Sequence, residues 1–434
     1  EGFLPKKKVD REKILFEISK NEKTTIVYES PHRLKKLLRE LLDFCGGERE
    51  ILVTRELTKK FDKVELKNIK VEIDEIDVSE ELISKELKSS IDLAFDNIYK
   101  FHLSQLTKND NIEILEGINC WQEKRPISNV GFYIPGGTAP LFSTVLMLGI
   151  PSLIAKCPNR VLCSPPDLSG NICPEILYAC KKCGINEIYK VGGSQAIAAM
   201  TFGTNSIPKV DKIFGPGNQY VTEAKKYSMN FGISIDMPAG PSELLVLADE
   251  SANPEYVAAD LLSQAEHGID SQVILVSNSK SLINDVKNHI NDQKKSLSRR
   301  IIIDQSLENS KFIFFDNLDF ALDFINEYSP EHYIINVLDE DYCISKLINA
   351  GSVFLGNYTP ESAGDYASGT NHTLPTNGYA KNYSGVNTDS FLKTITFQKI
   401  TKDGLSKISK AVECMAENEG LDAHKEAVSI RMKK

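Results

Sequence analysis

From residue 130 onward, short apolar runs rich in Val, Ile, Leu and aromatic residues alternate with segments of helical periodicity. The runs predicted to be strands are 131–134, 160–163, 187–191, 212–214, 233–236, 243–247, 272–276, 311–315 and 332–337. Helices are predicted between them, including 174–183, 194–202 and 253–267. This alternation predicts an α/β fold with doubly wound sheets, built as two successive sets of elements.

The segments that flank this alternating region have other patterns. Residues 80–105 predict a long amphipathic helix, because Ile83, Leu87, Ile91 and Phe95 recur at four-residue spacing. Residues after about 399 predict helices that pack on a partner. Residues 1–62 predict a small α/β fragment, with helices at 10–19 and 32–44 and strands at 24–29 and 50–55.

Composition narrows the class of protein. A chain of 434 residues has room for two or three domains, and 41% hydrophobic residues is ordinary for a globular protein. The net charge of −9 argues against a dedicated nucleic-acid binder. Residues 1–60 differ, with 15 Lys and Arg against 11 Asp and Glu, which fits either an RNA-facing module or a solvated helical surface.

Cysteine use and the long apolar stretch indicate the compartment. The nine cysteines have no disulfide-like rhythm, which predicts a reducing cytoplasm. The pair Cys180 and Cys183 has metal-knuckle spacing, but it ends an apparent helix without a second pair, so we interpret it as structural. Pro135, Pro140 and Pro151 interrupt the apolar stretch 133–157, which excludes a membrane span there. With no visible signal peptide, we expect a cytoplasmic protein.

The candidate functional residues lie in a few short polar motifs that contain histidine. The chain has seven histidines, and Gln264 and His267 are three residues apart, so on a helix they share one face. An Asp and a further His would complete a four-ligand nitrogen and oxygen site, which suits a zinc ion that does chemistry. The alternative is that Gln264 caps a helix and the histidines satisfy buried polar groups.

A series of motifs resembles histidinol dehydrogenase from about residue 57 to the end. The motifs, in order, are VGFYIPGGTAP (130–140), GGSQAI (192–197), FGPGN (214–218), DMPAGPS (236–242), LSQAEHG (262–268), SPEH (329–332), SAGDYASGTNH (362–372) and EGLDAH (419–424). The resemblance implies two Rossmann-like doubly wound domains and oxidation of L-histidinol to L-histidine, through the aldehyde, with two NAD. It also implies one zinc ion per subunit, held by Gln264, His267, Asp365 and His424.

The same resemblance assigns the remaining roles. His332 is the expected base for the alcohol proton, and Glu331 is the expected activator of water. Substrate binding is expected from Ser242, Gln264, His267, His332, Asp365, Glu419 and His424. His372 is either a further substrate contact or a loop hydrogen-bonder. NAD binding is expected from Tyr133, Gln195 and Asn218, although the dinucleotide fingerprint G-x-G-x-x-G is absent. The glycines near Asn218 also fit a simple tight turn.

Four segments are predicted from this resemblance. Residues 62–132 and 243–385 form a discontinuous first domain, 133–242 form the NAD-binding domain, and 386–434 form a helical dimerisation tail. Glu419 and His424 lie in that tail and come from the partner subunit in the family, so a homodimer with a shared active site is expected.

Residues 1–61 resemble a different family. The words EGFLPKKK (1–8), YESPHRL (28–34) and VTRELTK (53–59) resemble the C-terminal half of a ribosomal small-subunit RNA 2′-O-methyltransferase. Its cofactor-binding half is absent, so we expect no methyl transfer. Because both resemblances fit TKKFD (58–62), we interpret the join as recombination or misassembly rather than a bifunctional protein. The alternative function is a non-catalytic RNA- or ribosome-binding chimera.

Overall fold

The computed structural model describes residues 2–5, 8–20, 27–28, 31–46, 70–71, 82–107, 110–136, 141–167, 169–238 and 240–433. The chain divides into two compact units, Glu1–Leu57 and Thr58–Lys434. The division lies a few residues before the predicted join between the two resemblances.

The first unit is a small α/β arrangement. Strand β1 (Gly2–Phe3) pairs in parallel with β2 (Val27–Tyr28), and helices α1 (Lys8–Lys20) and α2 (Pro31–Cys45) pack on each other. A buried cluster that includes Leu4, Leu15 and Leu37 forms its core. Both predicted helices of this segment are present, whereas the strand predicted at 50–55 lies outside the described residues.

The second unit contains a six-stranded sheet, ordered β10-β9-β6-β7-β8-β3. Its strands are β3 (Lys70–Val71), β6 (Asn129–Tyr133), β7 (Asn159–Ser164), β8 (Glu187–Lys190), β9 (Lys212–Phe214) and β10 (Ser234–Ile235). All neighbours pair in parallel except β3, which is antiparallel to β8. The central strands are apolar and buried, as expected for parallel strands covered on both faces.

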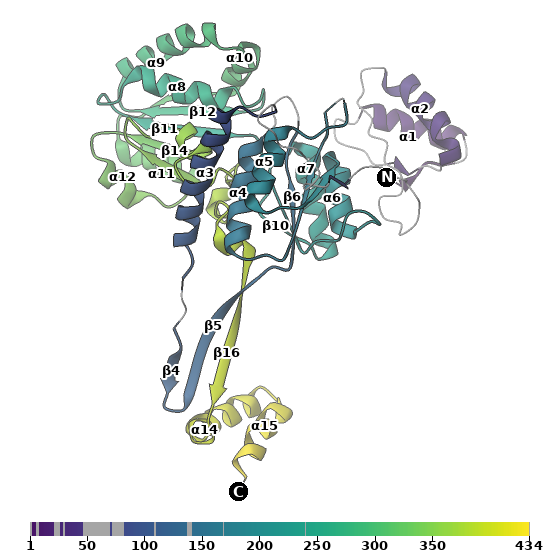
Figure 1. Ribbon diagram of the computed structural model, residues 1–434, viewed down its shortest axis with the longest axis vertical. Helices are drawn as coiled ribbons and strands as arrows, with labels where there is room; N and C mark the ends of the chain where they lie inside the picture. The colour runs from purple at the N-terminus through teal and green to yellow at the C-terminus, as the bar shows by residue number, and fades with distance from the viewer. Residues whose placement is uncertain are drawn as a thin grey trace. The chain divides into compact units, whose positions relative to one another are not determined.

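Helices cover this sheet on both faces (Figure 1). They are α3 (Lys85–Ser104), α4 (Phe142–Ile154), α5 (Pro174–Cys183), α6 (Gly193–Phe202) and α7 (Gln219–Ser228). α3 begins at the cap Ser84, whose side chain accepts a hydrogen bond from the Leu87 backbone, and it packs on α4. The predicted amphipathic helix is therefore present, four to five residues shorter at its start.

The position of α3 differs from the predicted domain division. Residues 62–132 were expected to belong with 243–385, yet β3 and β6 lie in the six-stranded sheet, and Ile91 and Ile98 of α3 enter its core. The reason is that the buried side of α3 matches the apolar surface of α4, which sequence spacing alone does not specify.

A five-stranded, fully parallel sheet follows, ordered β13-β12-β11-β14-β15. Its strands are β11 (Glu243–Ala248), β12 (Gln272–Ser277), β13 (Lys311–Phe314), β14 (His332–Asn336) and β15 (Ser352–Leu355). On one face lie α8 (Pro254–Ala265), α9 (Lys280–Gln293) and α10 (Arg300–Asn309); on the other lie α11 (Leu318–Tyr328) and α12 (Glu340–Lys346) (Figure 1). The predicted α/β class with doubly wound parallel sheets is confirmed.

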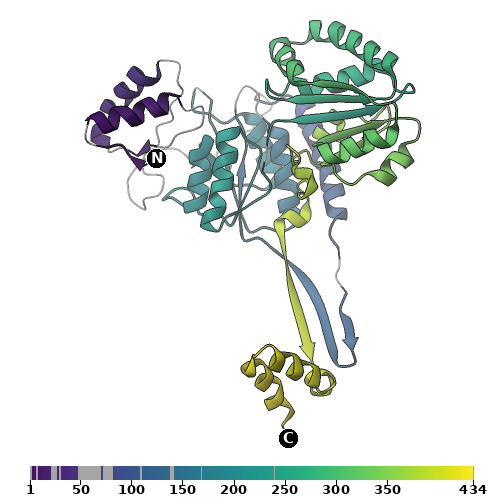
Figure 2. The ribbon, with the colours of Figure 1, turned by 180° about the vertical axis from the view of Figure 1, so that it is seen from behind.

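A three-stranded antiparallel arm, ordered β16-β5-β4, extends from the six-stranded sheet (Figure 2). Its strands are β4 (Ile112–Leu115), β5 (Ile118–Pro126) and β16 (Leu392–Ile400), and the helices α14 (Lys402–Asn418) and α15 (Asp422–Met432) follow. The tail was predicted to be helical, but it begins with β16. Its residues are mostly exposed on both faces, so the strand leaves no one-sided apolar pattern in the sequence.

Among the described helices, none combines the length and the apolar composition that crossing a membrane requires.

Candidate active site

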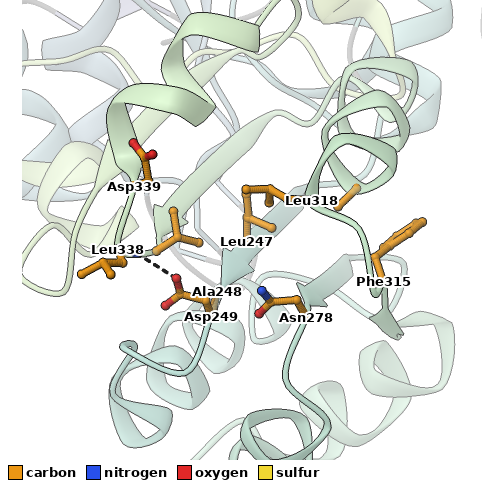
Figure 3. Close-up of a pocket in the computed structure, with 10 residues that line it drawn as sticks. Leu247, Ala248, Asp249, Asn278, Phe315, Leu318, Leu338 and Asp339 are labelled. Atoms are coloured by element: carbon orange, nitrogen blue, oxygen red, sulfur yellow. Dashed lines mark hydrogen bonds between the residues drawn. The ribbon is translucent and has the colours of Figure 1, made fainter.

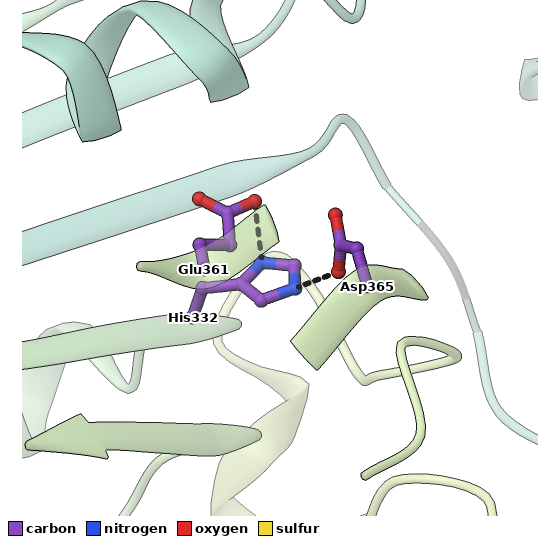
Figure 4. Close-up of side chains that lie close together, drawn as sticks. All are labelled: His332, Glu361 and Asp365. Atoms are coloured by element: carbon purple, nitrogen blue, oxygen red, sulfur yellow. Dashed lines mark ion pairs between the residues drawn. The ribbon is translucent and has the colours of Figure 1, made fainter. Parts of the chain in front are cut away.

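The predicted catalytic pair lies at the amino end of β14. His332 is the first residue of the strand, Glu331 precedes it, and both are buried. The His332 ring has three carboxylates around it. Nδ1 lies 3.6 Å from Glu331 Oε2. Nδ1 also lies 3.7 Å from Glu361 Oε1, and Nε2 lies 3.5 Å from Asp365 Oδ1 (Figure 4). The site therefore places one imidazole among three acids.

Two of these acids come from a single short helix, α13 (Glu361–Tyr366). Glu361 and Asp365 are four residues apart, so both project from one face toward His332. One ligand atom from each of the three residues lies within 4.8 Å of the other two, the geometry of a possible metal cluster among the described residues. Sequence analysis missed Glu361, although its i, i+4 spacing to Asp365 was a usable signal.

Burial and mutual charge shift the protonation of this cluster. Burial raises the pKa of Glu331 to about 8 and raises the pKa of Glu361. Desolvation acts to lower the pKa of His332, but Glu361, Glu331 and Asp365 raise it well above its usual value. Desolvation acts to raise the pKa of Asp365, but the adjacent His332 with the His372 and His267 charges lowers it. A buried group of this kind is typical of functional sites.

Gln264 reaches the same cluster from the end of α8, and His267 lies two residues beyond that helix. Gln264 is buried in the last turn, and its Nε2 lies 3.5 Å from His332 Nδ1. The helix ends at Ala265, so His267 lies beyond it, contrary to the predicted helix through 267; its backbone N–H still bonds to Gln264 O at 3.2 Å. The His267 side chain is exposed; desolvation lowers its pKa, and the Asp365 charge acts in the opposite direction.

Several buried polar atoms of this cluster make no hydrogen bond among the described residues. Within the described part of the chain, Gln264 Oε1, His332 Nε2 and Glu361 Oε2 are buried and make no hydrogen bond. Unsatisfied buried polar atoms are costly. Their convergence is the arrangement expected of a site that takes an ion or a polar ligand.

His372 contacts the backbone of Asp365. Its Nδ1 is 2.9 Å from the Asp365 carbonyl oxygen, and its Nε2 is 3.0 Å from Thr144 Oγ1. Both ring nitrogens therefore have protein partners, which favours the loop hydrogen-bonding interpretation of this residue. It also lines the main cavity described below.

Glu243, the first residue of β11, links the catalytic pair to a neighbouring loop. Its backbone N–H donates to Glu331 Oε2 at 2.8 Å, and its carbonyl oxygen lies 3.1 Å from His332 Nδ1. Its Oε1 accepts from the Asn377 backbone at 2.9 Å, and burial raises the pKa of its carboxyl to about 7. Sequence analysis missed this residue, which follows the predicted substrate contact Ser242.

A cavity of about 240 Å³ lies beside the catalytic pair. Its walls come from the ends of strands in both sheets and from the 372–376 loop: Pro135, Gly215, Pro216, Gly217, Asn218, Lys225, Asp236, Met237, Gly240, Ser242, Glu331, His372, Thr373, Leu374 and Thr376. It thus joins the carboxyl ends of β6 and β9 to the amino ends of β11 and β14. In the six-stranded sheet, β6 and β9 flank the point where strand order reverses, the place where doubly wound sheets bind ligands.

The three residues predicted to bind NAD surround this reversal point. Tyr133 ends β6, and its hydroxyl accepts from the Gly193 backbone at 3.0 Å. Gln195 lies in the first turn of α6, and its side chain packs near Gly193. Asn218 caps α7, its Oδ1 accepting from the Tyr220 and Val221 backbones, and it is exposed to the cavity. The fold brings all three to the carboxyl edge of one sheet.

The structure does not bring His424 and Glu419 to this cluster. Glu419 follows α14, His424 lies in α15, and both are exposed. α14 starts beyond the far end of the nine-residue β5–β16 ladder, and its Lys407 bonds to Glu116 in the turn of the arm. A ladder of that length spans about 30 Å. The two residues therefore lie at the end of the arm, away from the site of their own chain (Figure 1).

A second cavity, of about 110 Å³, lies at the carboxyl ends of β11, β12 and β14 (Figure 3). Its polar rim already has structural partners. Asp249 Oδ2 accepts from the Leu338 backbone at 2.9 Å, and Asp339 caps α12 through the Tyr342 backbone. None of the predicted site residues lies here, and the chemistry of the site gathers at the other end of these strands.

Comparison with known proteins decides the family. The sequence model of histidinol dehydrogenase matches residues 48–432. The chain is 56% identical over 386 residues to a histidinol dehydrogenase of Bacteroides thetaiotaomicron, covering 89% of this chain and 90% of that protein. The chain belongs to the histidinol dehydrogenase family. The predicted family and class, an NAD-dependent oxidoreductase, are thereby confirmed.

More distant members agree. The chloroplastic histidinol dehydrogenase of Arabidopsis thaliana is 52% identical over 382 residues, covering 87% of this chain and 82% of that protein. A crystal structure of histidinol dehydrogenase from Elizabethkingia anophelis has a TM-score of 0.83 and 52% identity, covering 100% of this chain and 98% of that one. The alternative of an RNA-binding chimera receives no support, and the methyltransferase resemblance of residues 1–61 stays a prediction.

Proposed function

We propose that the cluster around His332 and the adjoining cavity oxidise L-histidinol to L-histidine through L-histidinaldehyde, reducing two NAD. One observation supports this most directly: a single cavity is lined both by the Asn218 turn and by Ser242, Glu331 and His372. A dinucleotide at the first edge and an amino alcohol at the second would meet inside it. Hydride transfer requires that proximity.

The metal proposed is one zinc ion per subunit, held by Gln264, His267, Asp365 and the partner's equivalent of His424. The donor set of two imidazoles, an amide oxygen and a carboxylate suits zinc, and the unpaired Gln264 Oε1 is an available ligand atom. When bound, zinc would act as a Lewis acid that holds the imidazole and amine of the substrate. Asp365 would then serve the metal as well as His332.

His332 is proposed as the base that takes the alcohol proton. The Glu243 carbonyl oxygen lies 3.1 Å from Nδ1, so in the neutral ring it fixes the N–H on that nitrogen and leaves Nε2 as the acceptor. Nε2 has no hydrogen-bond partner among the described residues and lies on the Asp365 side of the ring. The hydrogen bond at the start of β11 thus supports the tautomer that a general base requires.

Glu331 is proposed to activate the water that hydrates the aldehyde. Its Oε2 accepts a hydrogen bond from the Glu243 backbone N–H, and Glu331 lines the cavity, which supports this role. Because the pKa of Glu331 is raised to about 8, its carboxylate is a stronger base than an ordinary glutamate. Ser242 and Glu419 complete the proposed substrate contacts, the latter from the partner subunit.

The NAD-binding residues proposed are Tyr133, Gln195 and Asn218, within the domain built on the six-stranded sheet. Their placement at the strand-order reversal of the six-stranded sheet supports this, although no G-x-G-x-x-G turn is present. The arm with α14 and α15 is proposed as the dimerisation element that delivers Glu419 and His424 to the other subunit. A cytoplasmic location remains the expectation from cysteine use.

Metal dependence tests the proposal on named residues. A metal chelator is expected to abolish NADH formation from L-histidinol, and added zinc to restore it. His267→Ala is expected to lower bound zinc and activity by at least a hundredfold, because the substrate then loses its fixed position. The matched control is His289→Ala on α9, outside the cluster, which should retain both. Full activity of the chelated protein or of His267→Ala would contradict the metal assignment.

A further inference from the structure

A buried ion pair lies behind the turn that faces the larger cavity. Lys225 of α7 and Asp236, which follows β10, have side chains only 3% and 1% exposed, with Nζ 2.6 Å from Oδ1. Both residues line the cavity that also contains the 215–218 turn. Neither is among the residues predicted to bind substrate, metal or NAD.

Both side chains of the pair form hydrogen bonds with the backbone of Gly215, in the 215–218 turn. Lys225 Nζ donates to the Gly215 carbonyl oxygen at 2.6 Å, and the Gly215 N–H donates to Asp236 Oδ2 at 2.7 Å. Asp236 Oδ1 also accepts from the Met237 backbone at 2.7 Å. Both backbone groups of Gly215 are therefore fixed by charged side chains, and charge-assisted hydrogen bonds are the stronger kind.

The position of Gly215 shows why these hydrogen bonds affect the cavity wall. Its φ is +120°, and a Cβ there would lie 2.1 Å from the Tyr133 carbonyl oxygen. The backbone of Gly215 thus passes directly against the end of β6, at the strand-order reversal. Three residues later Asn218 starts α7. A rotation of the Gly215 peptide would move the Asn218 side chain and the first N–H groups of the helix.

The charges themselves argue for a role beyond stability. Burying an ion pair pays a desolvation penalty that often cancels its attraction, and apolar side chains of similar volume serve a core equally well. The hydrogen bonds of this buried pair go to the Gly215 and Met237 backbones, so the pair fixes the backbone geometry there. The geometry it fixes here is that of the cavity wall.

We infer that Lys225 and Asp236 are positioning residues for the nicotinamide dinucleotide, holding the 215–218 turn so that its backbone and Asn218 meet the cofactor. This inference rests on the proposed function, which assigns NAD to this turn. Neither side chain takes part in proton or hydride transfer. Loss of the hydrogen bonds from Lys225 and Asp236 to Gly215 is expected to weaken NAD binding. The proposed L-histidinol site, at the amino ends of β11 and β14, should be unchanged.

The test uses the full-length, zinc-loaded protein and compares Asp236→Asn, Lys225→Met and the double variant with wild type. Asp236→Asn keeps the shape and one acceptor oxygen, so it is the variant expected to fold. The KM for NAD is expected to rise about tenfold or more in each, with kcat at saturating NAD and the KM for L-histidinol within about twofold. The double variant should raise the KM for NAD no more than the worse single variant, because the two side chains act as one clamp.

Two further measurements separate positioning from stability. Binding of NADH to the folded variants, followed by the fluorescence of NADH, should weaken in parallel with the KM for NAD. Lys294→Met, which breaks the more exposed Lys294–Asp304 pair on the surface of the other sheet, should change neither constant. A fall in thermal stability with an unchanged KM for NAD, or equal changes in both Michaelis constants, would overturn the inference. A wild-type protein that forms no NADH from L-histidinol would instead overturn the proposed function.

Discussion

At the scale of single residues, the environment of His332 determines how it can act. A general base must be unprotonated, whereas Glu361, Glu331 and Asp365 hold the pKa of His332 well above its usual value. The base form of His332 therefore accumulates at a higher pH than that of a free imidazole. The carboxylates around the ring therefore control the pH at which His332 could act as the proposed base.

This gives a pH prediction for the reaction. The rate constant kcat/KM for L-histidinol is expected to rise with pH along a limb centred above 6.5. Glu361→Gln removes a carboxylate that raises the pKa of His332, so the limb should shift to lower pH. The measurement is kcat/KM between pH 5.5 and 10 for both proteins, with zinc in excess. An unchanged limb, or one shifted to higher pH, would show that another group controls the rate.

Part of this site was predictable from the sequence, and part was not. Glu331, His332, Gln264 and Asp365 stand in distinctive motifs, and the structure gathers the other three around the His332 imidazole. Gln264 and His267 were expected on one helix, but α8 ends at Ala265 and His267 lies beyond its cap. Glu243 was missed because it contributes mainly backbone atoms, which no side-chain pattern reveals.

At the scale of elements, the proposed catalytic residues lie at the amino ends of β11 and β14 in the five-stranded sheet. The proposed NAD-binding turn, 215–218, lies at the carboxyl ends of β6 and β9 in the six-stranded sheet. Most strands and helices of both sheets were predictable, because buried parallel strands leave continuous apolar runs. The arm was not. β16 alternates Thr, Lys and Gln with Ile and Phe but is exposed on both faces, so its pairing with β5 depends on a contact 266 residues or more away in sequence.

The base of the arm has one anchoring side chain. Phe391, immediately before β16, is fully buried and stacks on Phe214 with ring centroids 4.2 Å apart. Phe391→Ala is expected to lower the free energy of unfolding by about 3–5 kcal/mol, since it empties a packed aromatic site. The matched control is Phe320→Ala on α11, whose side chain is 63% exposed and whose change should stay within about 0.5 kcal/mol. Urea denaturation measures both, and equal losses would refute this account of the anchor.

At the scale of the whole molecule, the exposed positions of His424 and Glu419 carry the main consequence. They lie on helices that follow an arm about 30 Å long, and their own chain's cluster lacks a fourth metal ligand of the proposed set. A symmetric dimer in which each arm reaches the other subunit resolves both facts. Sequence analysis could name His424, but only the fold shows that it lies far from His332.

Mixing two inactive variants tests this exchange. His332→Ala and His424→Ala are each expected to lose activity as pure dimers. After the two are unfolded together and refolded, random pairing makes half of the dimers mixed, each with one intact site, so about a quarter of wild-type activity should return. If His424 served its own chain, every site would keep one defect. No recovery in refolded dimers of confirmed size would therefore exclude the shared site.

The most direct test of the whole account is the number of NADH formed per L-histidinol consumed by the zinc-loaded protein. The account predicts two for wild type, because His332 starts the first oxidation and Glu331 hydrates the aldehyde for the second. It predicts that Glu331→Gln stops near one, with the aldehyde trapped by a carbonyl reagent. A wild-type ratio of one, or no NADH at all, would contradict the assignment of both steps to this site.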